Sequence, residues 1–281
     1  MLVVKDVSLS FGTVPVLAQM QLQAQPGELC VLMGANGAGK STLLRTIAGE
    51  YKHYRGSILL NGQELHHMPV DAQARQRAVL SQQLNLQMPF TVAEVAAMGR
   101  YAYRAAERQY DKEIITYALK LLQVYDLKDR SYPTLSGGQQ QRVQMARVLA
   151  QLLEAPDLHA MDYSGKKMLL LDEPVTGMDI LHQQLALQLA VQLSRQGVLV
   201  IAVLHDFQLT AAYAQRIFFL KNGRVYAQGP VATVLSPLHI RHCFGVDVSV
   251  LHHSLCAYPL VVTNTATTLF SSSALQATNA Y

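Results

Sequence analysis

Short apolar and alternating runs divide the chain into predicted strands and helices. The first run, residues 2–10, alternates apolar and polar positions, which is typical of a half-buried strand. Residues 43–49 have helical spacing and end at a glycine. We predict five strands before residue 83, at 2–10, 14–22, 29–33, 56–62 and 78–82. The first part of the chain is therefore rich in β-structure, with antiparallel strands ahead of the buried run 29–33.

Beyond residue 83 the pattern turns helical until about residue 132. The apolar positions that share one helix face there are Ile114, Ile115, Ala118, Leu119 and Leu122. Ser136 is a candidate N-cap for a helix from 137 toward 154, before Pro156. The remaining predicted elements are a strand at 168–171, a helix at 180–195, a strand at 198–204 and a strand pair at 217–227. Helices between buried strands predict an α/β fold with a mainly parallel sheet and ligands at the carboxyl ends of its strands.

The segment that joins the strand 29–33 to the next helix has the complete P-loop pattern G-x-x-x-x-G-K-[ST]. Its glycines let backbone N–H groups surround a polyphosphate at the positive end of a helix. Lys40 is expected to reach the β- and γ-phosphates, and the Ser41 hydroxyl to bind Mg²⁺. A glycine-rich turn without a ligand is the alternative. The residues predicted to bind a nucleotide here are Gly34, Asn36, Gly37, Ala38, Gly39, Lys40, Ser41 and Thr42.

Two carboxylates and a histidine follow later buried strands. Asp172 and Glu173 come directly after four apolar residues, where an unpaired charge is costly unless it serves a cation or a reaction. With a P-loop upstream, Asp172 is expected to hold Mg²⁺ and Glu173 to polarise the attacking water. His205 ends the strand 198–204 and could bind the γ-phosphate. The alternatives are two solvated carboxylates in a turn and a structural histidine.

Composition limits the class of protein. The chain has 281 residues, half of them hydrophobic, but no apolar run approaches the roughly 20 residues that cross a bilayer. The first residues contain no basic leader, so nothing argues for export. Three cysteines predict no disulfide framework and fit a reducing cytoplasm. The net charge of +4 could suit phospholipid or nucleic acid, but an ordinary soluble surface is the favoured interpretation.

A second phosphate-binding site is predicted at residues 135–139, Leu-Ser-Gly-Gly-Gln, where backbone N–H groups lie at a helix N-terminus. One nucleotide does not need two such sites, so the second is expected to serve another copy. At this point the chain resembles the ATP-binding subunits of ABC transporters, from Leu2 to about Leu260. The matching motifs are Walker A at 34–42, the Q-loop at Gln82, the signature at 135–139, Walker B at 168–172 with Glu173, the D-loop at 176–179 and the switch histidine His205.

The resemblance implies a P-loop NTPase core with an N-terminal antiparallel β subdomain, and an ATP hydrolase in which Glu173, His205 and Lys40 are catalytic. It also implies a head-to-tail homodimer with two ATP molecules and Mg²⁺. Further nucleotide contacts are assigned by the resemblance to Phe11, Gln82, Ser136, Gly137, Gly138, Gln139 and Asp179, and metal contacts to Ser41, Gln82 and Asp172. On the sequence alone, Phe11 could equally pack in the core. Gly177 and Met178 depart from the usual Ser-Ala-Leu-Asp D-loop, whereas Asp179 is kept.

Within the family, residues 88–100 resemble the iron-chelate importers, and most of all the haemin importer ATPases. Residues 156–167, 203–206 and 244–248 agree with that branch. The resemblance implies haem (haemin) uptake across the inner membrane, with two membrane-spanning permease subunits and a periplasmic substrate-binding protein. The ATPase would be peripheral on the cytoplasmic face. Ferric siderophore and cobalamin import are the alternatives for the cargo.

Two alternatives from other classes remain. A soluble ABC-type ATPase acting on nucleic acid would carry a long coiled coil or a second cassette, and neither fits in this sequence, so no nucleic-acid partner is expected. A nucleotide-binding regulator without hydrolysis is disfavoured by the presence of Glu173 and His205.

The predicted domain spans 1–262, with a helical subdomain at about 84–154, and is followed by a poorly ordered tail at 263–281. No Asp, Glu, Lys or Arg follows Asp247, and the tail is mostly Ser, Thr, Ala and Asn. No zinc-like spacing connects the late histidines and cysteines, and we expect no metal site there. These residues are His239, His242, His252, His253, Cys243 and Cys256.

Overall fold

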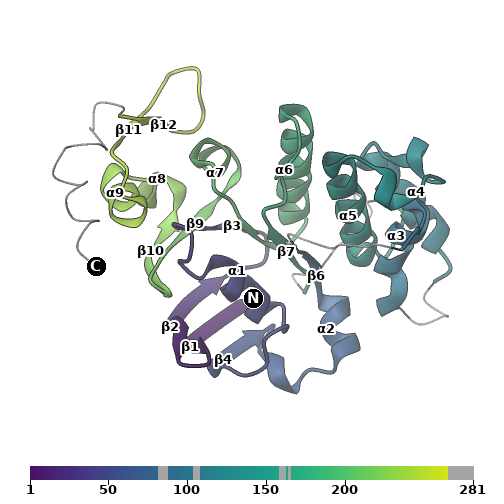
Figure 1. Ribbon diagram of the computed structural model, residues 1–281, viewed down its shortest axis with the longest axis horizontal. Coiled ribbons are helices and arrows are strands. Elements are labelled where there is room, and N and C mark those ends of the chain that lie inside the picture. The colour runs from purple at the N-terminus through teal and green to yellow at the C-terminus, as the bar shows by residue number, and fades with distance from the viewer. Residues whose placement is uncertain (82–87, 104–107, 158–162, 164–165, 265–281) are drawn as a thin grey trace, which may run out of the picture.

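The computed structural model describes residues 1–81, 88–103, 108–157, 163 and 166–264 (Figure 1). An antiparallel sheet forms from the first part of the chain, in the order β2-β1-β4-β5. Its strands are β1 (Leu2–Phe11), β2 (Val14–Ala24), β4 (Arg55–Leu60) and β5 (Gln63–Glu64). Buried and exposed positions alternate along much of β1, as its sequence predicts. This confirms the antiparallel strands expected ahead of the P-loop.

The central sheet has six strands in the order β10-β9-β3-β8-β7-β6. Five of them are parallel, and β10 pairs antiparallel with β9. The strands are β3 (Leu29–Met33), β6 (Arg77–Leu80), β7 (Met168–Asp172), β8 (Leu199–Val203), β9 (Arg216–Lys221) and β10 (Arg224–Pro230). Every residue of β3, β7 and β8 is buried, which explains their continuous apolar sequences. The carboxyl ends of these three neighbours deliver the P-loop, Asp172 and His205 to one edge of the sheet.

The hydrophobic core lies on both faces of this sheet. Leu29, Val31 and Met33 of β3 belong to one buried cluster, and Cys30 and Leu32 to the other, as the alternation of a strand requires. The first cluster is shared with helices α5 and α6, and the second with α1 and the antiparallel sheet.

The described α-helices differ in length and position. They are α1 (Lys40–Ile47), α2 (Val70–Gln76), α3 (Val92–Ala97), α4 (Asp111–Leu121), α5 (Gly137–Leu152), α6 (Ile180–Arg195), α7 (Phe207–Tyr213), α8 (Val231–Val234) and α9 (Pro237–Phe244). Short 3₁₀ helices lie at η1 (Leu65–His67), η2 (Met98–Ala102), η4 (Tyr125–Leu127) and η5 (Tyr132–Thr134). Helices α3, α4 and α5 pack together on one side of the central sheet and form the expected helical subdomain (Figure 1). None of the described helices combines the length and the apolar character needed to cross a membrane.

The C-terminal part contains a hairpin that the sequence analysis did not predict. Strands β11 (Val248–Leu251) and β12 (Leu260–Thr263) pair antiparallel, and the Asn264 N–H donates to the Asp247 carbonyl. Thr263, the first residue of the expected poorly ordered tail, is therefore the last residue of a strand, and the predicted boundary is too early. Residues 265–281 lie outside the described residues.

Candidate functional site

The P-loop curves around the N-terminus of α1. Gly39 is the N-cap with φ 97°, in the left-handed region that a glycine adopts without strain. The Lys40 ammonium is buried and donates to the carbonyls of Gly34 at 2.8 Å and Ala35 at 3.0 Å. At Gly34 a Cβ atom would lie 2.4 Å from the backbone oxygen of Leu220, so the loop admits no side chain there. The loop thus offers backbone N–H groups and one ammonium to an anion.

Ser41 and Asp172 are brought together across 131 positions of sequence. The Ser41 hydroxyl donates to Asp172 Oδ1 at 2.9 Å. Oδ2 of Asp172 is buried and has no hydrogen-bond partner among the described residues. Burial raises the pKa of Asp172, although the bond from Ser41 opposes that shift. A hard cation such as Mg²⁺ prefers a carboxylate and a hydroxyl oxygen, so this pair fits the group that the sequence predicted for it.

Burial also affects the lysine that begins α1. Desolvation lowers the pKa of Lys40, and the charges of Glu173 and Asp172 oppose that change. An ammonium held between carbonyl dipoles and two acids remains a donor for phosphate oxygens.

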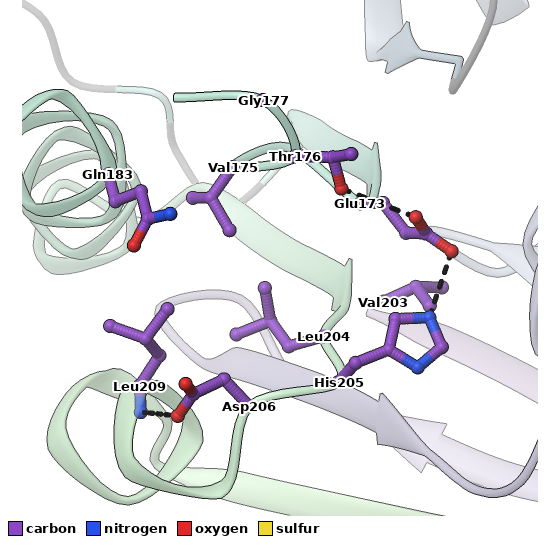
Figure 2. Close-up of a pocket in the computed structure, with 10 residues that line it drawn as sticks. All are labelled: Glu173, Val175, Thr176, Gly177, Gln183, Val203, Leu204, His205, Asp206 and Leu209. Carbon is purple, nitrogen blue, oxygen red and sulfur yellow. Dashed lines mark hydrogen bonds and ion pairs between the residues drawn. The ribbon is translucent and has the colours of Figure 1, made fainter. Parts of the chain in front are cut away.

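Glu173 and His205 meet at the ends of β7 and β8. Nε2 of His205 and Oε1 of Glu173 are 2.8 Å apart, and the Thr176 hydroxyl donates to Glu173 Oε2 at 3.3 Å (Figure 2). Glu173 has φ 51°, which is uncommon for a residue with a side chain and marks a sharp turn of the backbone directly after β7. The three side chains line a cavity of about 200 Å³ that extends between α6 and α7. A carboxylate paired with a histidine in this way can accept a proton from water.

The signature residues form a separate cavity. Ser136 caps α5 by accepting from the Gln139 N–H at 3.3 Å, while the Gln139 side chain accepts from the Ser136 N–H at 3.0 Å. This is a capping box, and it leaves the N–H groups of Gly137 and Gly138 at the positive end of the helix. A cavity of about 270 Å³ is lined by Ser136, Gly137, Gly138, Gln139, Arg142, Gly177, Met178, Asp179 and His182.

The D-loop borders both cavities. Gly177 lines each of them, and a Cβ at Gly138 would lie 3.0 Å from the Gly177 oxygen, so the signature helix packs directly on this loop. Asp179 caps α6 by accepting from the His182 N–H at 2.9 Å, and its carboxylate lies 2.8 Å from His182 Nδ1. The hydrogen bonds from His182 hold the pKa of Asp179 below its usual range.

The sequence analysis did not assign Arg142 and His182 to this site. His182 follows Asp179 by three positions, and that helical spacing is a signal from which the contact could have been predicted. Arg142 lies one turn after Gly138 on the same helix, and its guanidinium donates to the carbonyls of Leu122 and Gln123.

The structure describes Phe11 but not Gln82, two residues that were expected to contact the nucleotide. The Phe11 side chain is 48% exposed and contacts Tyr51 edge to face, with ring centroids 5.3 Å apart. The alternative of core packing is therefore wrong, and the assignment of Phe11 to a purine stays a prediction. Gln82 lies outside the described residues.

The late histidines have ordinary partners. Nδ1 of His239 lies 2.7 Å from the Val234 carbonyl, and the His242 ring stacks on Tyr226 with centroids 4.3 Å apart. In the described part of the chain, no three His, Cys, Asp or Glu side chains are grouped to hold a metal ion.

Comparisons with known proteins agree with this arrangement of motifs. The sequence pattern of the family described as ABC transporter matches residues 17–176. A hemin import ATP-binding protein of Gloeobacter violaceus is 43% identical over 247 residues, which are 88% of this chain and 88% of that protein. The protein of the same name from Pseudomonas aeruginosa is 39% identical and covers 93% of this chain and 99% of its own length.

Solved structures show the same fold. The ATP binding subunit of an ABC transporter has a TM-score of 0.71 at 26% identity, covering 87% of this chain and 93% of that one. A dimeric bacterial ABC transporter cassette has a TM-score of 0.68 at 28% identity, covering 82% and 99%. The family pattern covers more than half of the chain, and the alignments with the two relatives cover most of each protein. The chain therefore belongs to the ABC transporter family and carries that family's ATP-binding cassette.

Proposed function

We propose that this chain is the ATP-hydrolysing subunit of an importer that moves haemin across the inner membrane. The observation that carries the cargo is the identity of 39–43%, over most of the chain, to proteins named hemin import ATP-binding proteins. Apart from His205, the residues named above for this branch lie outside the nucleotide motifs, and the cargo would pass through the membrane subunits. The haemin assignment therefore rests on ancestry and on partner fit.

In the proposed mechanism the P-loop binds ATP. The backbone N–H groups of residues 34–42 surround its β- and γ-phosphates, and Lys40 turns from the carbonyls of Gly34 and Ala35 to the phosphate oxygens. Ser41 and Asp172 would hold Mg²⁺, with Gln82 as a further ligand. When bound between these residues, Mg²⁺ would supply positive charge that offsets the negative charge of the phosphates. Phe11 would stack on the adenine, because its ring is exposed near the antiparallel sheet.

Glu173 would act as the general base. Its side chain is only 19% exposed, and its carboxylate accepts from the Thr176 hydroxyl while facing His205. It orients a water for in-line attack on the γ-phosphorus and accepts a proton from it. His205 would donate from its ring to a γ-phosphate oxygen, so that it links the phosphate to Glu173 across the 2.8 Å contact.

The second cavity would receive ATP from another copy. The phosphates would come from a nucleotide bound to the P-loop of that other copy. The groups that would face them are Ser136, the backbone N–H groups of Gly137 and Gly138, Gln139 and Asp179. We therefore propose a head-to-tail homodimer that encloses two ATP molecules. Dimeric solved cassettes at 27% and 28% identity support a homodimer of this kind.

The proposed assembly has further subunits. Two membrane-spanning permeases would contact the ATPase dimer, and a periplasmic binding protein would deliver the cargo, so that this chain is peripheral on the cytoplasmic face. We propose one ATP-binding domain that runs from residue 1 through β12, beyond the expected boundary at residue 262, with its helical subdomain at about 84–154. The subdomain is the part that could move with the permeases, because α3, α4 and α5 pack mainly on one another beside the central sheet (Figure 1).

Vesicles that contain this chain, its permease and the matching binding protein test the proposal. Haemin uptake that requires ATP and Mg²⁺ is the expected result, and the same vesicles with Lys40→Ala should show none. Uptake of a ferric siderophore or cobalamin without haemin transport would overturn the cargo and leave the importer. An absence of ATP-dependent transport of all three, with an active permease, would overturn the importer itself.

A further inference from the structure

The segment that carries His205 is short and fixed at both ends. β8 ends two residues before His205, and α7 begins two residues after it, at Phe207. The Asp206 side chain caps α7 by accepting from the Leu209 N–H at 2.8 Å (Figure 2). The strand side is rigid, because β8 is buried between β3 and β7. Any displacement of α7 must therefore be taken up by the backbone around His205.

The other side of α7 contacts the C-terminal unit, which we define as residues 231–264. Nε2 of Gln208 donates to the carbonyl of Val261 in β12 at 3.0 Å. The Phe207 ring packs edge to face on Phe244 at the end of α9, with centroids 5.0 Å apart and an interplanar angle of 78°. Phe244 packs in the same manner on Phe219 of β9, at 6.1 Å. The C-terminal unit thus joins α7 to the central sheet without contacting any nucleotide motif through these residues.

A glutamine at position 208 is not expected if the side chain contributes only to packing. Its Oε1 is buried and has no hydrogen-bond partner in the described part of the chain. A buried amide oxygen without a partner costs free energy, and an apolar side chain of the same length would avoid that cost. Packing alone therefore does not explain a glutamine at this position, whereas its bond to β12 does.

From these contacts we infer that Gln208 and Phe207 are positioning residues, through which the C-terminal unit holds α7 so that His205 stays in contact with Glu173. The inference rests on the proposed ATP hydrolysis. The His205 to Glu173 contact of 2.8 Å is of hydrogen-bond length, and small misplacements of reacting groups slow a reaction strongly. Neither positioning residue touches ATP, and both act through the short segment before α7.

Gln208→Met in the full-length chain tests the inference, because methionine keeps the length of the side chain and removes the donor to Val261. We expect kcat for ATP hydrolysis to fall by about two- to tenfold, the range of one hydrogen bond, with the KM for ATP unchanged. In a His205→Ala background, single-turnover hydrolysis with the chain in excess should be no slower after Gln208→Met. A merely structural contribution would slow both backgrounds equally.

Two further variants complete the test. Phe207→Leu removes the ring contact with Phe244 and leaves the Gln208 hydrogen bond in place, and it should also lower kcat. Ser249→Ala changes a residue of β11 whose hydroxyl bonds Asn264 and not α7, so it should keep the kcat of the unchanged chain. Unchanged kcat in both Gln208→Met and Phe207→Leu would overturn the inference, as would equal losses with and without His205. If the unchanged chain does not hydrolyse ATP, the proposed function fails instead.

Discussion

Glu173→Gln separates ATP binding from ATP hydrolysis. The amide has the shape of the carboxylate, so its oxygen can still face His205 Nε2 and its nitrogen can donate to the Thr176 hydroxyl. Because both contacts can persist, we expect the free energy of unfolding to change by less than about 1 kcal/mol. The amide accepts no proton, however, and loss of a general base lowers kcat by about 10²- to 10⁴-fold. ATP should still bind, and the ATP-bound dimer should accumulate because its ATP is no longer hydrolysed.

Size-exclusion chromatography with light scattering measures the dimer, and phosphate release measures turnover. With ATP and Mg²⁺ the Glu173→Gln chain should elute as a dimer, while without ATP it should match the unchanged chain. Thr176→Val is the matched control, since it removes only the 3.3 Å bond to Glu173 and should cost less than about tenfold in kcat. Near-normal turnover of Glu173→Gln, or a chain that remains monomeric with ATP, would refute the role of Glu173 as the base.

Five further substitutions test other parts of the site and fold. Gly34→Ala would place its Cβ 2.4 Å from a backbone oxygen of β9, so a binding assay with a fluorescent ATP analogue should detect no complex. Ser136→Ala and Thr91→Ala each remove a capping box and should each lower stability by about 1 kcal/mol in urea titrations, but only the first should abolish ATP-dependent dimerisation. Arg100→Met removes a buried guanidinium that bonds an aspartate and two carbonyls, so thermal unfolding should show a loss of about 3 kcal/mol or more. Lys128→Met, at an exposed ion pair of 3.4 Å with Asp129, should cost under about 1 kcal/mol.

The elements that the sequence predicted best are those with one dominant signal. Helix α6 spans Ile180–Arg195, as the apolar spacing predicted, and Asp179 caps it. The buried strands β3, β7 and β8 have continuous apolar sequences because both of their faces are covered. In these segments local propensity and burial favour the same structure, so the pattern alone is sufficient.

The hairpin of β11 and β12 was missed because its sequence contains no strong turn signal. Its two strands have four residues each, and the segment between them, 252–259, contains histidine, serine, cysteine and a proline instead of an Asn-Gly pair. The low charge after Asp247 makes any disorder signal there weak, but it does not indicate a strand pair either. The pairing instead depends on the packing of the hairpin against α7 and α9, which no local pattern reports.

The contacts of the candidate site could not be derived from the motifs either. The sequence predicted that Ser41, Asp172, Glu173 and His205 follow buried strands, but the order of those strands decides which side chains meet. β8 lies between β3 and β7, although it is the last of the three in the chain. A crossover of this kind is consistent with many orders of parallel strands, and periodicity does not distinguish them.

Strand order also explains why the site acts as one unit. With β3, β8 and β7 adjacent, the hydrogen bond from Ser41 to Asp172 links the first helix to the end of β7, and the contact of Glu173 with His205 links that end to β8. A group that binds between Ser41 and Asp172 would therefore affect a backbone that is one residue from Glu173, the proposed base. His205 in turn is two residues from α7, which the C-terminal unit holds. On the proposed mechanism, the region beyond residue 176, where the family pattern ends, would contribute to the geometry of hydrolysis as well as to the bulk of the domain.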